Sequence, residues 1–433
     1  MNYQQTLDYL YSKLPLFTRF GAAAYKADLH NIMALTAAIG NPEKQFKTVH
    51  IAGTNGKGSS SHFLASIFQE AGYKTGLFTS PHLKDFRERI RVNGKMISRQ
   101  KVVRFTEKYS PLFDEIQPSF FEMTVALAFE HFAKEKVDIA IIETGLGGRL
   151  DSTNIISPEL SLITNISMDH MDLLGDTIAK ISYEKAGIIK QGIPVVISEE
   201  QEESRAVFID KGTNQDAQLV FASDLVTWNK EKVVFENGRN YLALTGENRY
   251  KNREAISVKS PLTGNYQQKN IKGVMVAAEV LKERGWKITK DHIQQGIYNA
   301  TVNTGLRGRW EQLSQKPLII CDTGHNEAGV KEVVAQLASI DYKHLHVVWG
   351  MVGDKDVSKV LALLPPKATY YFCKANLPRA MAADVLQQMA LEKGLTGRKY
   401  SSVKRAVLAA KRAANQADMI LIGGSIFVVA EAI

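Results

Sequence analysis

A glycine-rich segment carries the clearest chemical pattern in the sequence. The run GTNGKGS follows an apolar β-rich stretch, precedes a segment with helical periodicity, and consists of Gly53, Thr54, Asn55, Gly56, Lys57, Gly58 and Ser59. Glycines let backbone N–H groups curve around a phosphate, the N-terminus of a helix adds positive potential, and Lys57 supplies a positive charge. Ile51 and Gly58 depart from the ordinary phosphate-loop pattern, which has Gly and then Ser or Thr at these positions. The strand–turn–helix setting still predicts a site for nucleotide phosphates.

Polar side chains follow three further β-rich runs. Glu143 ends one run, Asp169 and His170 follow the next, and Ser80 follows an earlier one. Ligands of open α/β sheets lie beyond the carboxyl ends of the strands, and a carboxylate there can hold Mg²⁺. Imidazole is an uncommon magnesium ligand, but its placement after a neighbouring strand favours a functional His170. Ser80 fits a metal ligand and a plain polar turn equally well.

Lys185 lies on an apolar helical face. Ile178, Ile181, Lys185 and Ile188 share one side of a helix that we predict over residues 177–190. Such a lysine usually extends along the apolar surface and keeps its amine in water. The alternative is a buried amine with a function, and the pattern by itself favours the exposed amine.

Similar chemistry recurs near the C-terminus. The run DTGHN at residues 322–326 follows a β-rich run and opens a predicted helix, Arg309 precedes it, and Ser425 follows the last predicted strand. One part of the chain would therefore present a phosphate loop and another would present charged strand ends. The simplest arrangement is a ligand cleft between two domains.

The elements that position these residues alternate along the chain. Strands are predicted at residues 47–52, 75–78, 138–142, 160–164 and 193–197, with helices at 59–71, 121–134 and 177–190. This alternation predicts a parallel sheet with both faces covered. Residues 219–260 differ, because Asn237-Gly238 between two β-rich runs predicts an antiparallel hairpin. A helix over residues 271–284 follows the hairpin.

A second α/β unit is predicted after residue 300. Its strands are expected at residues 318–322, 346–350, 369–373 and 419–423, and Gly and Asn residues cluster just before it. We therefore predict two α/β domains. Residues 1–299 would form a mostly parallel-sheet phosphate-loop ATPase domain with a small antiparallel excursion, and residues 300–433 a smaller Rossmann-like α/β domain.

Composition limits the classes of protein that fit. A net charge of +9 fits an anionic substrate or nucleic acid, but the basic residues form no block, so no nucleic-acid partner is predicted. Cys321 and Cys373 lie in apolar runs without metal-ligand spacing and should be buried free thiols. The sequence shows no apolar signal core and no apolar run long enough to span a membrane. A cytoplasmic protein without a membrane partner is expected.

A series of motifs resembles the Mur ligase superfamily, and within it the folylpolyglutamate synthase/dihydrofolate synthase family. The resemblance covers essentially the whole chain. It is carried by GTNGKGS (53–59), TSPHL (79–83), ETGLGGRLDSTN (143–154), DHMDLLG (169–175), EKAGIIK (184–190), GNYQQKN (264–270), GRWE (308–311), DTGHN (322–326), GDKD (353–356), PRA (378–380) and GSIFVVAE (424–431). Three positions depart from the family pattern: Tyr266 stands where His is usual, Leu306-Arg307 where Trp-Pro is common, and Thr323 where a small residue precedes Gly324.

The resemblance implies an ATP-dependent ligase of folate biosynthesis and one-carbon metabolism. It would add L-glutamate to dihydropteroate, reduced folyl-glutamates or both through an acyl phosphate, with ATP and two Mg²⁺ ions and as a monomer. The implied metal ligands are Ser80, Glu143 and His170. The implied ATP contacts, besides the glycine-rich run, are Asn270, Arg309 and Asp322.

The resemblance also implies catalytic and substrate residues. Lys57, Lys185 and His170 would be catalytic, with Lys185 carrying a carbamate. Phe121, Glu122 and Asp151 would lie near the pterin end of the acid, and His325 and Ser425 near the incoming glutamate.

Two other protein classes share the glycine-rich loop. A Mur ligase that acts on a nucleotide-linked peptidoglycan precursor would normally carry a separate N-terminal domain, and only 46 residues precede the first predicted strand. A nucleotide-switch protein would use the same loop to drive partner binding. Release of ADP that depends on a pterin acid and on glutamate would exclude a pure switch.

Overall fold

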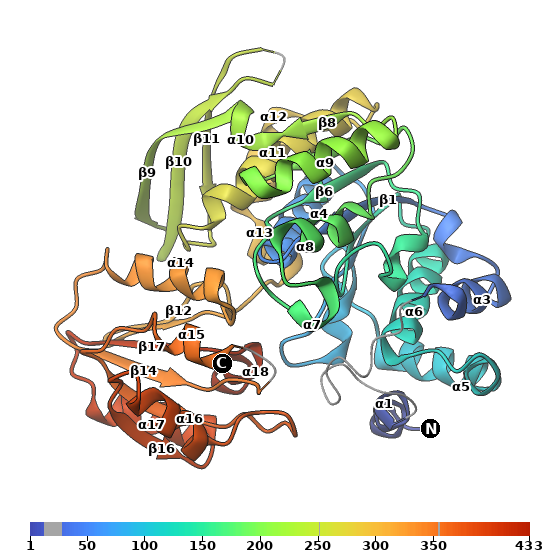
Figure 1. Ribbon diagram of the computed structural model, residues 1–433. Helices are drawn as coiled ribbons and strands as arrows, with labels where there is room; N and C mark the ends of the chain where they lie inside the picture. Colours follow the sequence, from blue (N-terminus) through green and yellow to red (C-terminus); the bar gives the residue numbers. More distant parts are fainter. Residues whose placement is uncertain (13–27, 251, 354–355) are drawn as a thin grey trace. The chain divides into compact units, whose positions relative to one another are not determined.

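The computed structural model describes residues 1–12, 28–250, 252–353 and 356–433 (Figure 1). The chain divides into two compact units, each assembled from separate segments. The first unit comprises Met1–Ser167, Met171–Pro261 and Gln267–Leu306, and the second comprises Met168–His170, Leu262–Tyr266 and Arg307–Ile433. Asp354 and Lys355 of the GDKD motif lie outside the described residues.

The first unit is built on an eight-stranded sheet with the order β4-β3-β2-β5-β1-β6-β7-β8. Six strands run parallel: β1 (Lys47–Ala52), β2 (Thr75–Phe78), β5 (Ile139–Glu143), β6 (Leu160–Ile163), β7 (Val195–Ile197) and β8 (Leu219–Phe221). Two short strands add an antiparallel edge: β3 (Ile90–Val92) and β4 (Lys95–Met96). The predicted parallel sheet is therefore confirmed, and the central strand β1 leads directly into the glycine-rich run.

Helices cover both faces of this sheet. On one face α4 (Lys57–Glu70) packs against α11 (Gln267–Glu283), α12 (Lys290–Tyr298) and α13 (Ala300–Thr304). On the other, α6 (Phe120–Glu135) packs with the helices α1 (Tyr3–Ser12), α3 (His30–Ala38) and α5 (Arg99–Ile116). The helix α8 (Ile178–Ala186) packs against α9 (Glu202–Asn214).

A separate three-stranded antiparallel sheet confirms the predicted excursion. It contains β9 (Val226–Glu236), β10 (Arg239–Asn248) and β11 (Glu254–Ser260), in the order β11-β10-β9. Asn237 and Gly238 form the turn between β9 and β10 with φ values of 52° and 76°. Both residues are left-handed, as a two-residue hairpin turn that matches the strand twist requires.

The second unit contains a six-stranded sheet with the order β12-β13-β17-β14-β15-β16. Five strands are parallel: β13 (Leu318–Cys321), β14 (Leu345–Trp349), β15 (Thr369–Cys373), β16 (Gly397–Tyr400) and β17 (Met419–Gly423). The antiparallel edge strand β12 (Glu311–Gln315) pairs with β13. The helices are α14 (Glu327–Leu337), α15 (Val357–Leu361), α16 (Ala383–Leu391), α17 (Val403–Ala413) and α18 (Ile426–Ala432).

Some details differ from the expectations. The helix predicted over residues 177–190 ends at Ala186, where Glu184 O accepts from Arg149 N at 2.7 Å. Ile188 N and Ile189 N then bond the carbonyl oxygens three residues back instead of continuing the α-helical pattern. The antiparallel strand β12 was not predicted, because Leu313 is its only apolar residue and no alternation of polar and apolar residues marks it. Residues 300–306 group with the first unit rather than the second, because α13 packs against α4.

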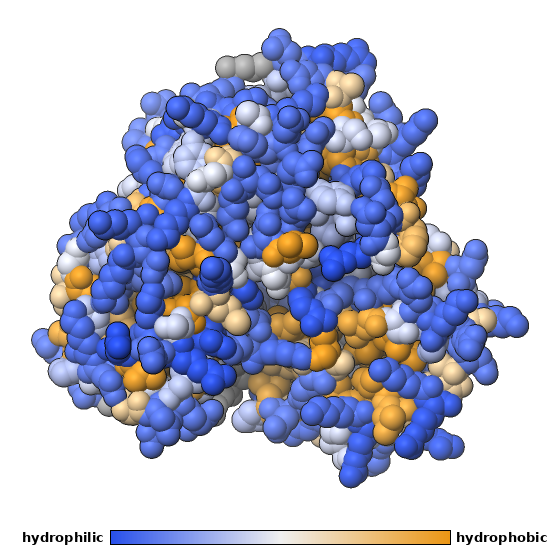
Figure 2. Space-filling view, turned by 180° about the vertical axis from the view of Figure 1, so that it is seen from behind, coloured by the Kyte–Doolittle hydropathy of each residue, from blue (hydrophilic) through white to orange (hydrophobic). Residues whose placement is uncertain are grey.

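The two cysteines and the exposed surface can be compared with what the composition predicts. Cys321 and Cys373 are buried free thiols, as predicted, and burial raises the pKa of Cys373 to about 12. Among the described residues, no helix is both long and apolar enough to cross a bilayer. The face in Figure 2 is mostly hydrophilic, with apolar side chains in separate groups.

Candidate functional site

The glycine-rich run forms a tight loop between β1 and α4. Gly53 and Gly56 have φ values of 149° and 87°. A Cβ atom on Gly53 would lie 1.9 Å from Thr164 Oγ1, and one on Gly56 would lie 2.2 Å from Asn270 Oδ1. Only glycine fits at these two positions, both for conformation and for space. The loop conformation is therefore dictated by the segments packed around it.

The segment after β6 holds the other side of the loop. Thr164 Oγ1 donates to Asn55 O at 2.6 Å, and Thr54 N donates to Asn165 O at 2.6 Å. Ser167 N donates to Thr54 Oγ1 at 3.0 Å. These bonds fix the loop to the carboxyl end of a neighbouring strand, where nucleotide phosphates bind in sheets of this kind.

The start of α11 contributes two buried amides to the loop. Gln267 Nε2 donates to Ser59 Oγ at 3.1 Å, and Asn270 Nδ2 donates to Gln267 Oε1 at 2.9 Å. Both side chains are buried. Asn270, which was expected to contact ATP, therefore lies beside the phosphate loop although it follows it by more than 200 residues in sequence.

Two lysine amines approach the same carbonyl oxygen of the loop. Lys57 Nζ donates to Gly53 O at 2.8 Å, and Lys185 Nζ donates to Gly53 O at 2.9 Å. Lys185 is only 3% exposed. The interpretation that this lysine extends to water is therefore wrong, because α8 directs its side chain into the protein toward the loop.

Glu143 and Ser80 lie together at the ends of β5 and β2. Ser80 N donates to Glu143 Oε2 at 3.2 Å, and Glu143 is 4% exposed. A buried carboxylate beside a hydroxyl-bearing residue fits the oxygen donors that Mg²⁺ prefers. His170 belongs to the second unit, so its role as a metal ligand stays a prediction. Within the described ranges, no three His, Cys, Asp or Glu side chains cluster in a way that could hold a metal by themselves.

The residues expected near the pterin acid have clear local contacts. The Glu122 carboxylate accepts from Ser119 N at 2.6 Å in a capping box at the start of α6. A Cβ atom on Gly145 would lie 2.5 Å from the Phe121 ring, so this ring packs on the loop that follows Glu143. Asp151 is buried and accepts from Gly145 N and Leu146 N, both at 2.8 Å. These contacts shape the loop, and substrate contact by the three side chains stays a prediction.

Asp322 accepts several hydrogen bonds within the second unit. Its Oδ2 accepts from Tyr266 Oη at 2.6 Å and from Trp310 N at 2.7 Å, and its Oδ1 accepts from Gly324 N at 2.7 Å. Burial raises the pKa of the Asp322 carboxyl, while these hydrogen bonds and Arg309 oppose the rise. The pKa of the Tyr266 hydroxyl is also raised, by burial and then by the Asp322 charge.

The other predicted residues of the second unit lie on strand ends. Arg309 Nη1 donates to Thr323 Oγ1. His325 Nδ1 bonds Thr323 O at 3.0 Å, and its Nε2 lies 3.7 Å from Asp169 Oδ2. Ser425 caps α18 by accepting from Phe427 N at 3.3 Å. Arg309, Asp322 and His325 therefore lie around Thr323. The Ser425 hydroxyl instead caps the first turn of its own helix.

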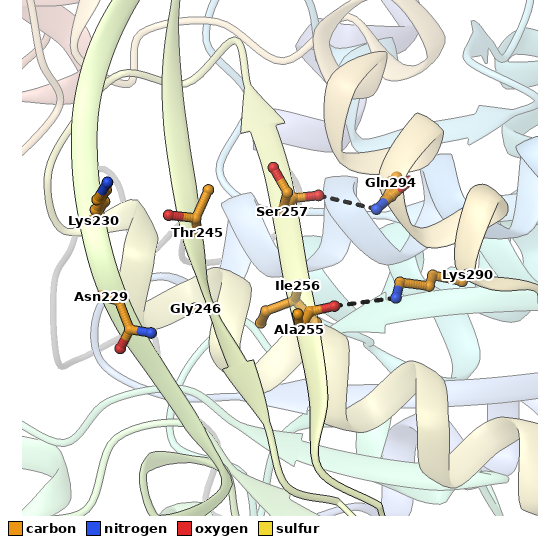
Figure 3. Close-up of a pocket in the computed structure, with 9 residues that line it drawn as sticks. All are labelled: Asn229, Lys230, Thr245, Gly246, Ala255, Ile256, Ser257, Lys290 and Gln294. Carbon is orange, nitrogen blue, oxygen red and sulfur yellow. Dashed lines mark hydrogen bonds between the residues drawn. The ribbon is translucent and has the colours of Figure 1, made fainter.

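An open pocket of about 480 Å³ lies elsewhere in the first unit, against the antiparallel sheet (Figure 3). Lys290 Nζ and Gln294 Nε2 of α12 donate to the carbonyl oxygens of Ala255 and Ser257 on β11, at 3.1 Å and 3.0 Å. These bonds satisfy the free edge of β11. None of the predicted site residues lines this pocket.

Several residues that contact the glycine-rich loop or lie close to it were not predicted from the sequence. Thr164 and Ser167 carried a usable signal, because both are polar residues that follow a strand on the same edge as Glu143. Gln267 stood inside a motif but had no spacing that linked it to the loop. The buried His50 and Thr153 carried no signal, because an isolated His within an apolar strand and a Thr in a turn are common.

Comparison with known proteins identifies the family of the chain. A model of the Mur ligase middle domain matches residues 51–278, and one of the Mur ligase glutamate ligase domain matches residues 308–426. Dihydrofolate synthase/folylpolyglutamate synthase of Bacillus subtilis is 35% identical over 89% of this chain and 88% of its own length.

Two solved structures show the same fold over the full chain. Escherichia coli FolC in complex with DHPP and ADP has a TM-score of 0.83 at 27% identity, covering 100% of this chain and 97% of its own. A bifunctional folylpolyglutamate synthase/dihydrofolate synthase with Mn, AMPPNP and L-glutamate bound gives the same four values. The chain belongs to the folylpolyglutamate synthase/dihydrofolate synthase family of the Mur ligase superfamily.

Proposed function

We propose that this chain adds L-glutamate both to dihydropteroate and to reduced folyl-glutamates, through an acyl-phosphate intermediate. Its family is one of ATP-dependent ligases, and the related proteins bind ADP or AMPPNP, DHPP, Mn and L-glutamate. The observation that carries the proposal is the convergence of Lys57, Lys185 and Asn270 on one glycine loop at the carboxyl edge of the sheet.

The reaction proceeds in two steps. A carboxylate oxygen of the acid substrate attacks the γ-phosphorus of ATP, and the bond from that phosphorus to ADP breaks. The amine of glutamate then attacks the acyl carbon, loses a proton, and expels phosphate with the former carboxylate oxygen. Lys57 and the amides of residues 53–59 stabilise charge on the transferred phosphoryl group, which is where such enzymes gain most.

The proposed metal ligands are Ser80, Glu143 and His170. The pairing of Ser80 with Glu143 supports a hard cation at this edge of the sheet. Two Mg²⁺ ions, when bound, would neutralise the phosphate oxygens and orient them. The chain's own contribution is a buried carboxylate held in place by the Ser80 amide.

Lys185 is proposed to carry a carbamate. Its amine is buried, and addition to carbon dioxide with loss of a proton would replace a cation by an anion. An anionic group suits a site that also binds magnesium, whereas two lysine cations on one carbonyl oxygen repel each other.

The remaining assignments follow the family. Arg309, Asp322 and Asn270 would contact ATP. Phe121, Glu122 and Asp151 would shape the pterin site, and His325 and Ser425 the glutamate site. We further propose a cytoplasmic monomer.

Oxygen transfer tests the acyl phosphate. Acid substrate labelled with ¹⁸O in its reacting carboxylate is incubated with ATP, Mg²⁺ and glutamate, and the released phosphate is analysed by mass spectrometry. One ¹⁸O atom per labelled carboxylate is expected in the phosphate. Unlabelled phosphate together with product formation would contradict the intermediate.

A further inference from the structure

A buried hydrogen-bonded chain links the strand before the phosphate loop to the loop after Glu143. His50 lies in the middle of β1, three residues before Gly53, and is fully buried. Its Nε2 lies 2.9 Å from Thr153 Oγ1, and Thr153 Oγ1 lies 2.5 Å from Asp151 Oδ1. Asp151 Oδ2 in turn accepts from Gly145 N and Leu146 N. Three side chains therefore connect two segments of the site.

The direction of each hydrogen bond follows from the chemistry of the groups. The Asp151 carboxylate accepts three backbone N–H bonds, from Gly145, Leu146 and Thr153, and so acts as the acceptor for the Thr153 hydroxyl as well. The Thr153 oxygen then accepts a hydrogen bond from the His50 ring, so Nε2 is the nitrogen that carries the hydrogen. His50 Nδ1 is buried and has no hydrogen-bond partner among the residues that the structure describes. Burial lowers the pKa of His50 to about 3, so the ring is neutral.

The same loop is also attached to the helix that carries Lys185. Arg149 N donates to Glu184 O at 2.7 Å, and Asn154 Nδ2 donates to Gly187 O at 3.0 Å. A Cβ atom on Gly148 would lie 2.9 Å from Lys185 O. The loop after Glu143 is therefore fixed on one side by α8 and on the other by the hydrogen bonds that run from His50 through Thr153 to Asp151.

We propose that His50 is a positioning residue, which acts through Thr153 and Asp151 to fix the Gly145–Leu146 backbone that supports the acid-substrate site. This proposal rests on the function proposed above, because the Phe121 ring that packs on Gly145 is assigned to the acid substrate. The phosphate loop is held by other residues, chiefly Thr164 and Gln267. Loss of the His50 bond should therefore affect the acid substrate more than ATP.

A matched pair of variants isolates the hydrogen bond. His50→Gln keeps an N–H donor near the position of Nε2, whereas His50→Met has a side chain of similar length to glutamine without a donor. An unpaired buried partner typically costs enough to change an equilibrium on the order of tenfold. His50→Met should raise KM for the acid substrate about tenfold and leave KM for ATP unchanged, and His50→Gln should recover most of this loss.

A second pair and a second readout keep the test independent of folding and of activity. Thr153→Val removes the linking hydroxyl and Thr153→Ser retains it, so only Thr153→Val should reproduce the His50→Met effect. Hydrogen–deuterium exchange of the Gly145 and Leu146 amides should accelerate in His50→Met and Thr153→Val and stay slow in His50→Gln and Thr153→Ser.

The outcomes separate this inference from the proposed function. A wild-type protein without ligase activity would defeat the proposed function. The exchange experiment would still test whether the hydrogen bonds from His50 through Thr153 to Asp151 hold the Gly145–Leu146 backbone. Equal exchange and equal KM in the Gln and Met variants would overturn the positioning role. A loss of kcat with no change in KM or in exchange would also overturn it, since it would show a general structural effect.

Discussion

At the scale of single residues, the loop carbonyl of Gly53 is the centre of the site. It accepts from the amines of Lys57 and Lys185, and Lys185 comes from a helix that begins 125 residues after Gly53. Two of the three departures from the family pattern also touch assigned nucleotide residues. Tyr266 bonds Asp322, and Thr323 accepts from Arg309. Both departures therefore lie at side chains that bond residues proposed to contact the nucleotide.

Glu143→Gln tests the metal assignment. The amide is nearly isosteric but lacks the negative charge, so magnesium should stabilise the transferring phosphoryl less. Turnover is expected to fall by roughly 10²–10³, measured as ADP release at saturating substrates. The exposed Glu203→Gln on α9 serves as the control for a lost carboxylate. Near-normal turnover in a folded Glu143→Gln protein would rule out Glu143 as a ligand.

Lys185→Ala tests the buried amine. The variant should lose at least about 10² in turnover if the carbamate helps to hold the charged groups in place. A small carboxylate such as acetate should partly restore activity, and mass spectrometry under carbon dioxide should detect the adduct on the native protein. Lys180→Ala, on the exposed face of the same helix, is the matched control. An active Lys185→Ala variant would show that the amine is only structural.

At the scale of elements, strand ends were the most predictable part of the site. Glu143, Ser80, Asp322 and the glycine-rich run all follow predicted strands, because an apolar run that ends in polar residues is a local signal. What could not be predicted depends on long-range packing. Gln267 reaches Ser59 across 208 residues, and Arg149 N bonds Glu184 O at the end of α8. No local pattern encodes either contact.

Gly187→Ala tests the packing of α8 against the loop that follows Glu143. The φ of Gly187 is −59°, which any residue adopts, but an added Cβ would lie 2.3 Å from Arg149 Cα. Overpacking of this kind typically costs about 1–3 kcal/mol, so the free energy of unfolding in urea should fall by this amount. In Gly212→Ala, on α9, the nearest atom would be 3.7 Å away, and stability should not fall. Equal stability of both variants would contradict the close contact.

At the scale of the whole molecule, buried histidines set how stability depends on pH. Burial is the largest cause that lowers the pKa of His50 and His82 to about 3 and of His131 to about 4. In the unfolded chain a histidine has a pKa near 6.5. Between these values the unfolded chain binds more protons than the folded one, so these histidines make stability fall as the pH drops below about 6.5.

His131→Gln should weaken this pH dependence. Removing one such histidine reduces the slope of unfolding free energy against pH by at most about 1.4 kcal/mol per pH unit between roughly pH 6.5 and 4. Urea unfolding at several pH values measures the slope. His30→Gln is the control, because that side chain is 92% exposed. An unchanged slope in His131→Gln would show that this ring is not held neutral by burial.

The most direct measurement of the central claim offers both acids to the enzyme in parallel. Dihydropteroate and a reduced folate are each incubated with labelled glutamate, ATP and Mg²⁺, and both incorporated label and ADP are counted. Label is expected in both acids, with one ADP per glutamate added and no ADP release when either the acid or glutamate is left out. Release of ADP without incorporation of glutamate into either acid would contradict the proposed ligase.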